Sequence, residues 1–226
     1  MARRTGSIAV FRALAPLAFA LALLLCVSLP GAASESRIFF SKSFPGSVPA
    51  YFEVELSASG EASYKEAPDE ADPLTFTLRP EETGEIFALA EKLEYFKKPV
   101  ASAKKVAFTG DKTFRFTGSA GEKQEVKFSF SEDLDAKALT AWFERIALTE
   151  RHLIELERAA QFDRLGVNKA LLLFQASFDD GRTVAVEQFV PVLQKISTGS
   201  KYVHVARSRA ASLVERIESA TRTTPE

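Results

Sequence analysis

Two histidines are the side chains on which acid-base or metal chemistry in this sequence would depend. His152 is followed three residues later by Glu155, and on a helix this spacing places both side chains on one face. A metal site of that type needs further ligands from other helices, and His204 is the one imidazole that remains. Because Arg151 and Arg158 alternate with the acids around His152, we interpret it as a surface residue of a charged helix.

Motifs for nucleophilic catalysis and for nucleotide binding are absent from the sequence. A serine nucleophile lacks the G-x-S-x-G turn, and neither a P-loop nor a G-x-G-x-x-G fingerprint occurs. The single cysteine, Cys26, lies in a segment that we expect to be removed. The 30 acidic residues allow many carboxylate pairs, so a metal-independent hydrolase stays an alternative. We therefore predict that the protein is not an enzyme and holds no cofactor or metal.

One stretch concentrates basic side chains, with the apolar residues Val100, Val106 and Phe108 between them. Such a stretch is typical either of a solvated loop or of a docking patch for an acidic partner or an anionic envelope polymer. We predict a docking patch for an envelope or extracellular protein, made of Lys97, Lys98, Lys104, Lys105 and Lys112.

The composition is that of an ordinary globular protein. The chain has 226 residues, of which 46% are hydrophobic and 26% are charged, and its formal net charge is −1. This charge balance argues against a nucleic-acid partner. One cysteine excludes a disulfide scaffold, so the 19 phenylalanines must supply much of the core.

The first residues have the pattern of an export signal. Arg3, Arg4 and Arg12 precede an uncharged apolar run over 13–29, and small residues follow up to Ala33. A basic region, an apolar region and a small-residue exit are the three parts of a signal peptide. We expect residues 1–33 to be removed near Ala33, which makes the protein periplasmic or secreted. Retention of the apolar run as a membrane anchor is the alternative, and it is the one membrane contact expected.

Alternating apolar residues predict a set of antiparallel strands. Phe52, Val54 and Leu56 face one way in a strand over 50–57, while charged residues face the other. The same pattern predicts strands over 37–43, 62–66 and 74–78. Two more strands, over 113–117 and 124–130, flank a glycine-containing turn and form a hairpin.

Two helices are predicted to follow the strands. Pro80 opens the first, with acids in its first turn, and Pro99 ends it. Ser131 or Asp133 caps the second. Its apolar stripe has a 3–4 spacing that indicates a long helix packed along one side: Leu139, Trp142, Ile146, Thr149, Leu153, Leu156 and Ala160.

The C-terminal region, residues 148–226, is predicted to be helical and to pack on an α+β domain over residues 34–147. We interpret 167–190 as a helix, a turn at Asp180-Gly181 and the start of a second helix near Glu187, with a β-hairpin as the alternative. We expect Ser200 to cap a final helix.

The phenylalanines at alternate strand positions are expected to fill the core, for example Phe114, Phe116 and Phe128. The alternative is that they line a groove between sheet and helices, which would make the protein a carrier of an apolar small ligand.

The order of these elements also carries a resemblance. The order begins with a strand over 51–57 and a turn at Gly60-Glu61. A helix opened by Arg79-Pro80-Glu81-Glu82 follows, and then a hairpin over 112–130 that precedes the helix of Trp142. Over residues 50–147 the chain resembles uncharacterised bacterial exported proteins, domains of unknown function built from hairpin-helix units. The resemblance implies an α+β fold and an exported setting, and no catalytic residue. Together these observations predict an antiparallel sheet with helices on one face, a C-terminal helical hairpin or bundle, and a non-enzymatic interaction module.

Overall fold

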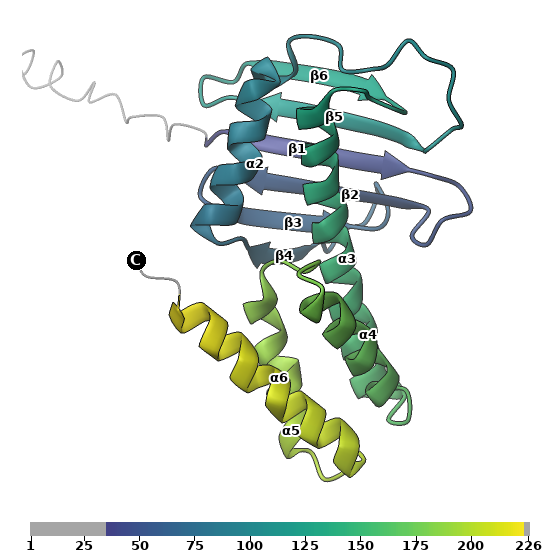
Figure 1. Cartoon of the computed structure of the whole chain (residues 1–226), viewed down its shortest axis with the longest axis vertical. Coiled ribbons are helices and arrows are strands. Elements are labelled where there is room, and N and C mark those ends of the chain that lie inside the picture. The colour runs from purple at the N-terminus through teal and green to yellow at the C-terminus, as the bar shows by residue number, and fades with distance from the viewer. Residues whose placement is uncertain (1–34, 224–226) are drawn as a thin grey trace, which may run out of the picture. The chain divides into compact units, whose positions relative to one another are not determined.

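The computed structural model describes residues 35–223, and these form an α+β fold (Figure 1). The predicted signal peptide and its cleavage near Ala33 lie outside the described residues. A six-stranded antiparallel sheet has the strand order β4-β3-β2-β1-β5-β6. Its strands are β1 (Arg37–Ser43), β2 (Tyr51–Ser57), β3 (Glu61–Lys65), β4 (Leu74–Thr77), β5 (Asp111–Thr117) and β6 (Lys123–Phe128). The helices are α2 (Pro80–Lys92), α3 (Leu134–Phe162), α4 (Val167–Asp179), α5 (Val190–Thr198) and α6 (His204–Thr223), with single turns η1 (Glu94–Phe96) and η2 (Val186–Phe189).

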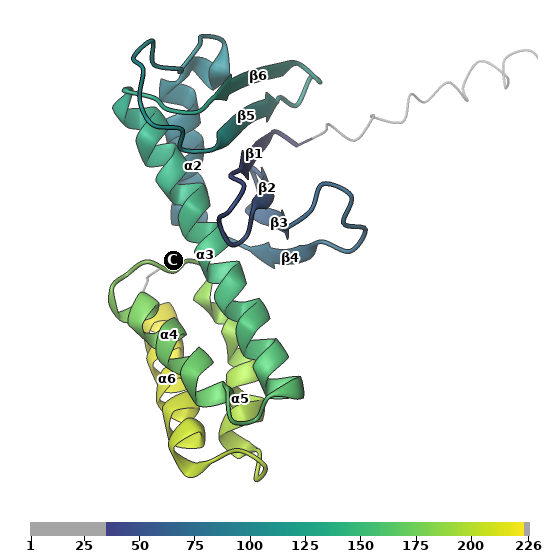
Figure 2. The same cartoon turned by 90° about the vertical axis from the view of Figure 1, so that its right-hand side faces the viewer.

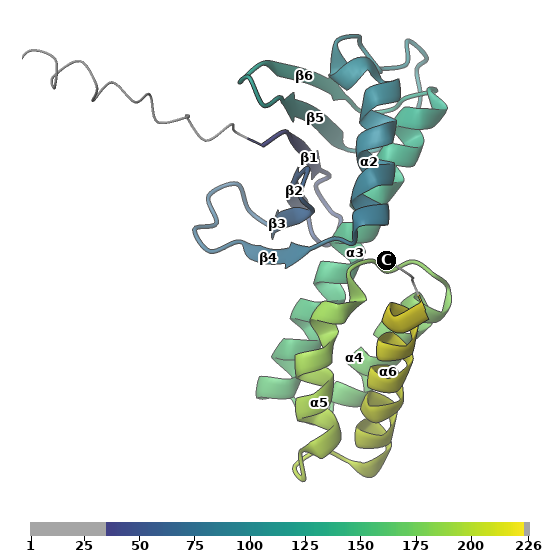
Figure 3. The same cartoon turned by 90° about the vertical axis from the view of Figure 1, so that its left-hand side faces the viewer.

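Helices cover one face of this sheet, as the alternating pattern predicts. The cross-strand register aligns the apolar residues, so that Phe40 lies opposite both Val54 and Phe114. Figures 2 and 3 show α2 and α3 on this face. The other face carries charged and polar residues, among them the ion pairs Arg37–Glu55 and Arg115–Glu125.

The first helix ends earlier than predicted. We expected it to reach Pro99, but α2 stops at Lys92. Glu94, Tyr95 and Phe96 follow with φ values of 51°, 51° and 66°, the left-handed region that non-glycine residues rarely adopt. This turn carries Phe96 into the core, where its ring stacks on Phe114 at 5.1 Å. The aromatic contact offsets backbone strain that the apolar pattern did not show.

The long helix α3 joins the sheet to the C-terminal helices. Asp133, one of the two predicted caps, accepts a hydrogen bond at 2.9 Å from the backbone N–H of Ala136. The predicted stripe is confirmed with one exchange: Trp142 is half-buried, and its neighbour Phe143 is fully buried instead. The first half of α3 packs on the sheet through Phe143 and Ile146, whereas Leu153 and Leu156 lie in the core of the bundle.

The C-terminal region is a bundle formed by the second half of α3 with α4, α5 and α6 (Figure 2). Helix α4 and the turn η2 confirm the helical interpretation of 167–190 and exclude the β-hairpin. The expected cap at Ser200 is wrong, because α6 begins at His204. The Tyr202 side chain occupies this connection, and its hydroxyl donates a hydrogen bond at 2.9 Å to the Ala160 carbonyl. Within the described residues, no helix has the length and hydropathy that crossing a membrane requires.

Candidate functional site

The predicted basic patch lies on the irregular segment between η1 and β5, residues 97–110. This segment packs against the β1–β2 connection, where the rings of Phe108 and Phe44 meet edge to face at 5.8 Å. Phe44 was not recognised in the sequence, because it falls outside every alternating pattern. Val106 and Phe108 remain 48% and 52% exposed. We define the loop surface as Lys97, Lys98, Lys104, Lys105, Val106 and Phe108.

The lysines of the loop surface differ in their partners. Lys98 pairs with Glu94, one helical turn before it, and Lys104 pairs with Glu132. Hydrogen bonds from Lys104 and Ser102 lower the pKa of Glu132. Lys97 and Lys105 are exposed and form no ion pair within residues 35–223. Two ammonium groups of the loop surface are thus free to meet an external anion.

Lys112 stands apart from the other four lysines of the predicted patch. Its side chain is buried at 7% exposure on the inner face of the sheet. The ammonium donates hydrogen bonds to the carbonyls of Thr109 at 3.0 Å and Ser129 at 2.7 Å, and to the Thr109 hydroxyl at 3.1 Å. Burial, with the nearby charge of Lys42, lowers the pKa of Lys112. Lys112 therefore ties the end of the 97–110 segment to β6 and offers no charge to a partner.

A shallow hollow adjoins the loop surface. Its walls come from the 97–110 segment and from the residues just after β6, and it is lined by Ala101, Ser102, Lys104, Lys105, Val106, Phe108, Ser129 and Phe130. The ammonium of Lys137, from α3, lies 5.4 Å from the centre of the Phe130 ring. The hollow therefore combines aromatic surface with positive charge, which suits a segment that carries both apolar and acidic side chains.

His152 is not the surface residue that we expected. It lies half-buried between α3 and α4, with its Nε2 at 2.9 Å from the hydroxyl oxygen of Ser177. Burial, together with the charges of Arg151 and Arg182, lowers the pKa of His152. A serine beside an imidazole is the start of a nucleophilic site, but Ser177 is buried within α4. The pair therefore holds two helices together. Among residues 35–223 there is no group of three or more His, Cys, Asp or Glu arranged to hold a metal.

A second unusual acid-base group is Glu150, on α3 between the sheet and the bundle. Its side chain is fully buried, and Oε1 accepts a hydrogen bond at 2.8 Å from the amide of Gln188. Among the described residues, Oε2 has no hydrogen-bond partner. Burial raises the pKa of this carboxyl to about 7. A raised pKa suits a general acid, but a carboxyl with no exposed surface cannot reach a substrate.

The space between sheet and helices is filled by aromatic rings. Phe40 stacks on Phe143 at 5.0 Å, and Phe114 lies within about 5 Å of the rings of Phe40, Phe96 and Phe128. Phe130, the last residue of the strand predicted over 124–130, is half-buried and lies beyond the end of β6. Rings at these distances are in contact, so the core interpretation of the phenylalanines is favoured over a ligand groove.

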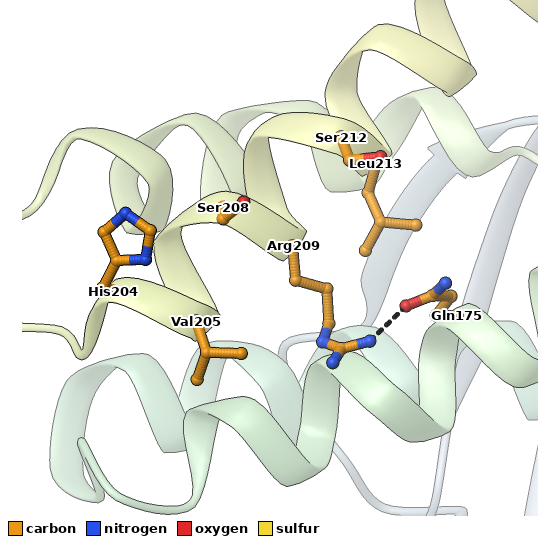
Figure 4. Close-up of a pocket in the computed structure, with 7 residues that line it drawn as sticks. All are labelled: Gln175, His204, Val205, Ser208, Arg209, Ser212 and Leu213. Atoms are coloured by element: carbon orange, nitrogen blue, oxygen red, sulfur yellow. Dashed lines mark hydrogen bonds between the residues drawn. The ribbon is translucent and has the colours of Figure 1, made fainter.

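Figure 4 shows a further pocket, between α4 and α6. The Arg209 guanidinium crosses it and donates a hydrogen bond to the side-chain oxygen of Gln175 at 2.5 Å. It also reaches the side-chain oxygen of Asn168 at 3.4 Å. The Arg209 side chain thus connects α6 to α4 and is already engaged within the bundle. Comparison with known proteins adds no candidate, since no family model, curated protein or solved structure matches the chain.

Proposed function

We propose that this protein is an exported, non-enzymatic interaction module that docks an acidic segment of an envelope or extracellular protein on its loop surface. The observation that carries the proposal is the pair Val106 and Phe108, two large apolar side chains half-exposed next to Lys105, whose ammonium forms no ion pair within residues 35–223. Scattered apolar residues on a surface need no explanation. Here they share one hollow with Lys104 and Lys105. The buried Lys112 side chain holds the end of the same segment through its hydrogen bonds.

The fixed backbone matters for affinity. A flexible loop loses conformational entropy when a partner orders it, and a loop that is already held loses less. At one end of the 97–110 segment, the hydrogen bonds of Lys112 and the contact between Phe108 and Phe44 hold Phe108 and Thr109. Nearer the other end, the Ser102 N–H donates a hydrogen bond at 2.9 Å to the Phe130 carbonyl. The lysines then favour acidic partners and accelerate their encounter, while Phe108 supplies the apolar contact.

The test places a photoreactive phenylalanine analogue at Phe108 in the protein expressed in its own host. We expect one discrete protein adduct on illumination. The adduct should disappear when the unpaired lysines are reversed by Lys97→Glu with Lys105→Glu. It should persist with Arg158→Glu and Lys195→Glu, which make the same charge change on exposed residues of the bundle.

Three results would overturn this proposal. The first is the absence of an adduct at Phe108. The second is an adduct that the reversal at Lys97 and Lys105 leaves unchanged, because the charges would then contribute nothing. The third is a ladder of polymeric adducts, which would assign the loop surface to an anionic polymer instead of a protein.

A further inference from the structure

The end of the bundle opposite the sheet carries a second exposed surface. Two connections meet there, the one from α3 to α4 (163–166) and the one from α5 to α6 (199–203), as Figures 2 and 3 show. The hydrogen bond from Tyr202 to the Ala160 carbonyl holds them together, and the Lys201 ammonium lies 3.4 Å from the same oxygen. We define the bundle tip as these two connections with Phe162 and Lys169.

Two large apolar side chains project from the bundle tip. Phe162, the last residue of α3, is 75% exposed, and Leu165, in the connection, is 84% exposed. Neither belongs to the apolar stripe of α3, which ends at Ala160. Val203 adds a third apolar side chain, 46% exposed, from the other connection. None of these three side chains lines the pocket between α3 and α4 that reaches the tip at Asp163, Gly166 and Lys169, so they project outside it.

Cations surround the projecting residues. Arg164 lies between Phe162 and Leu165 in the sequence, Lys169 follows one turn into α4, and Lys201 comes from the second connection. Arg164 and Lys169 form no ion pair within the described residues 35–223, and both are exposed. The acid of the tip, Asp163, is engaged locally, because its Oδ1 accepts a hydrogen bond at 3.0 Å from the Gly166 N–H. The tip therefore presents free positive charge beside exposed apolar surface.

The opposite end of α3 provides an internal comparison. Leu134 is 79% exposed, as much as Phe162, but it is flanked by Glu132, Asp133 and Asp135. Acids at a helix N-terminus stabilise the helix dipole, so their presence there has a structural explanation. The cations of the bundle tip lie beyond the last turn of α3, which contains no basic residue. The dipole of α3 accounts for Lys201, whose ammonium lies 3.4 Å from the Ala160 carbonyl in the last turn. It does not account for Arg164 and Lys169, which make no such contact within the described residues.

We propose that the bundle tip docks on a bilayer surface that carries anionic headgroups. Phe162 and Leu165 enter the interfacial region, and Arg164, Lys169 and Lys201 approach the headgroup phosphates. A bilayer suits this geometry better than a protein does, because a stable protein interface buries about 800 Å² on each partner. Two protruding side chains on a turn offer little such area, but they insert readily into lipid while basic residues add electrostatic attraction. This proposal is independent of the loop surface, which belongs to the sheet.

Vesicle binding tests it with the chain from Ser34 onward, because both core clusters lie within residues 38–217. The probes are vesicles of phosphatidylcholine alone and vesicles with one quarter phosphatidylglycerol. We expect binding to the anionic vesicles that weakens with added salt. Phe162→Ser with Leu165→Ser should weaken it by about tenfold or more, and Arg164→Glu by at least about fivefold. Val48→Ser with Leu134→Ser, which are as exposed as Phe162 and Leu165 but lie outside both surfaces, should leave it unchanged.

A fluorescence measurement locates the contact. Phe162→Trp should give an emission that shifts to the blue with anionic vesicles, and Leu134→Trp, equally exposed on the same helix, should not shift. Equal binding to both kinds of vesicle, or equal binding by the Phe162→Ser/Leu165→Ser variant, would overturn the proposal. So would a concentration-dependent dimer that this double variant abolishes, since the tip would then be an interface between two copies. Both substituted residues are exposed, so an unchanged melting temperature confirms that the variants fold.

Discussion

The sheet and the bundle of this protein are filled by different kinds of side chain. The core under the sheet is aromatic, with Phe40, Phe114 and Phe143 in mutual contact. The core of the bundle is mainly aliphatic, and α6 contributes Ala206 and Ala210 to it. Small side chains let helices approach closely, whereas the space between a pleated sheet and a helix requires long side chains from alternate strand positions. The phenylalanine surplus of the sequence is therefore a property of the sheet.

The border between the two cores is formed by polar residues of α3. Both cores are built on α3, whose buried apolar residues up to Ala147 pack on the sheet and whose buried apolar residues from Leu153 pack in the bundle. Between them lie the polar residues Thr149 and Glu150, both fully buried. The Thr149 hydroxyl accepts a hydrogen bond at 3.1 Å from the Val184 N–H. A rigid helix and buried polar contacts thus connect an aromatic core to an aliphatic one.

The largest expected effect comes from removing an aromatic ring of the sheet. Phe114→Ala deletes a fully buried ring that touches four others, and large-to-small changes of this kind cost about 3–5 kcal/mol of unfolding free energy. Because α3 is shared, we expect the whole molecule to unfold in one transition. Urea unfolding followed by Trp142 fluorescence, near the sheet, and by far-ultraviolet circular dichroism, dominated by helices, should give coincident curves.

The matched change in the bundle is Phe174→Ala, which removes a ring stacked on Phe189 at 3.9 Å. It should shift the midpoints of both unfolding curves to lower urea concentration by the same amount, as we expect for Phe114→Ala. If Phe114→Ala shifts the fluorescence curve and leaves the helical signal in place, the two cores are independent units, and the comparison between them becomes one between two domains.

A smaller effect on the free energy of unfolding is expected from Glu150, at the border between the two cores. The folded chain holds the Glu150 proton up to a pKa of about 7, while the unfolded chain releases it near the ordinary value of 4.5. The unfolded state therefore binds fewer protons between these two pH values, and stability falls as the pH rises through that window. Above it, Glu150→Gln should be more stable than the natural protein by up to about 3 kcal/mol. The stability of Glu150→Gln should depend less on pH than that of the natural protein.

Other side chains near Glu150 also affect its pKa. Glu157, on the same helix, also raises the pKa of Glu150, and Tyr64 of β3 senses the Glu150 charge. Gln188 of η2 donates to the carboxylate and lowers the pKa. Glu155→Gln, at an exposed position of α3, is the control. A natural protein whose melting temperature follows the same pH curve as Glu150→Gln would show that Glu150 titrates normally.

Much of this fold was predictable because its signals are local. Alternation in Tyr51–Ser57 and the spacing along α3 each depend on residues within one element, and both are confirmed. The end of α2 was not predictable, because the left-handed turn at Glu94–Phe96 is stabilised by rings from β5, which follows in the sequence. Local pattern also cannot choose between Trp142 and Phe143, because the position of the sheet decides which one is buried.

The candidate sites were less predictable than the fold. Clustering in sequence suggested five lysines, but burial separates Lys112 from the rest, since strand alternation places it on the inner face of β5. Phe162 and Leu165 gave no signal, because a residue off the apolar stripe is expected at a surface anyway. Only the meeting of two distant connections brings Lys201 to the end of α3 that carries Phe162, where its ammonium lies 3.4 Å from the Ala160 carbonyl.

The smallest effect expected here concerns the cation buried in the aromatic core. Lys112→Met keeps the apolar stem beside Phe128 but removes the ammonium that donates to the carbonyls of Thr109 and Ser129, which costs about 1–3 kcal/mol. Ser129 keeps the hydrogen bond from the Thr109 hydroxyl at 2.7 Å. The larger consequence is local: hydrogen exchange of residues 101–110 should accelerate, while α4 and α6 stay protected. Lys105→Met, an exposed change of the same kind, should alter stability by less than about 0.5 kcal/mol. If exchange in 101–110 does not change in Lys112→Met, the contact between Phe108 and Phe44 and the bonds from Lys104 and Ser102 to Glu132 are sufficient to hold the loop surface, and the buried charge of Lys112 is not needed for it.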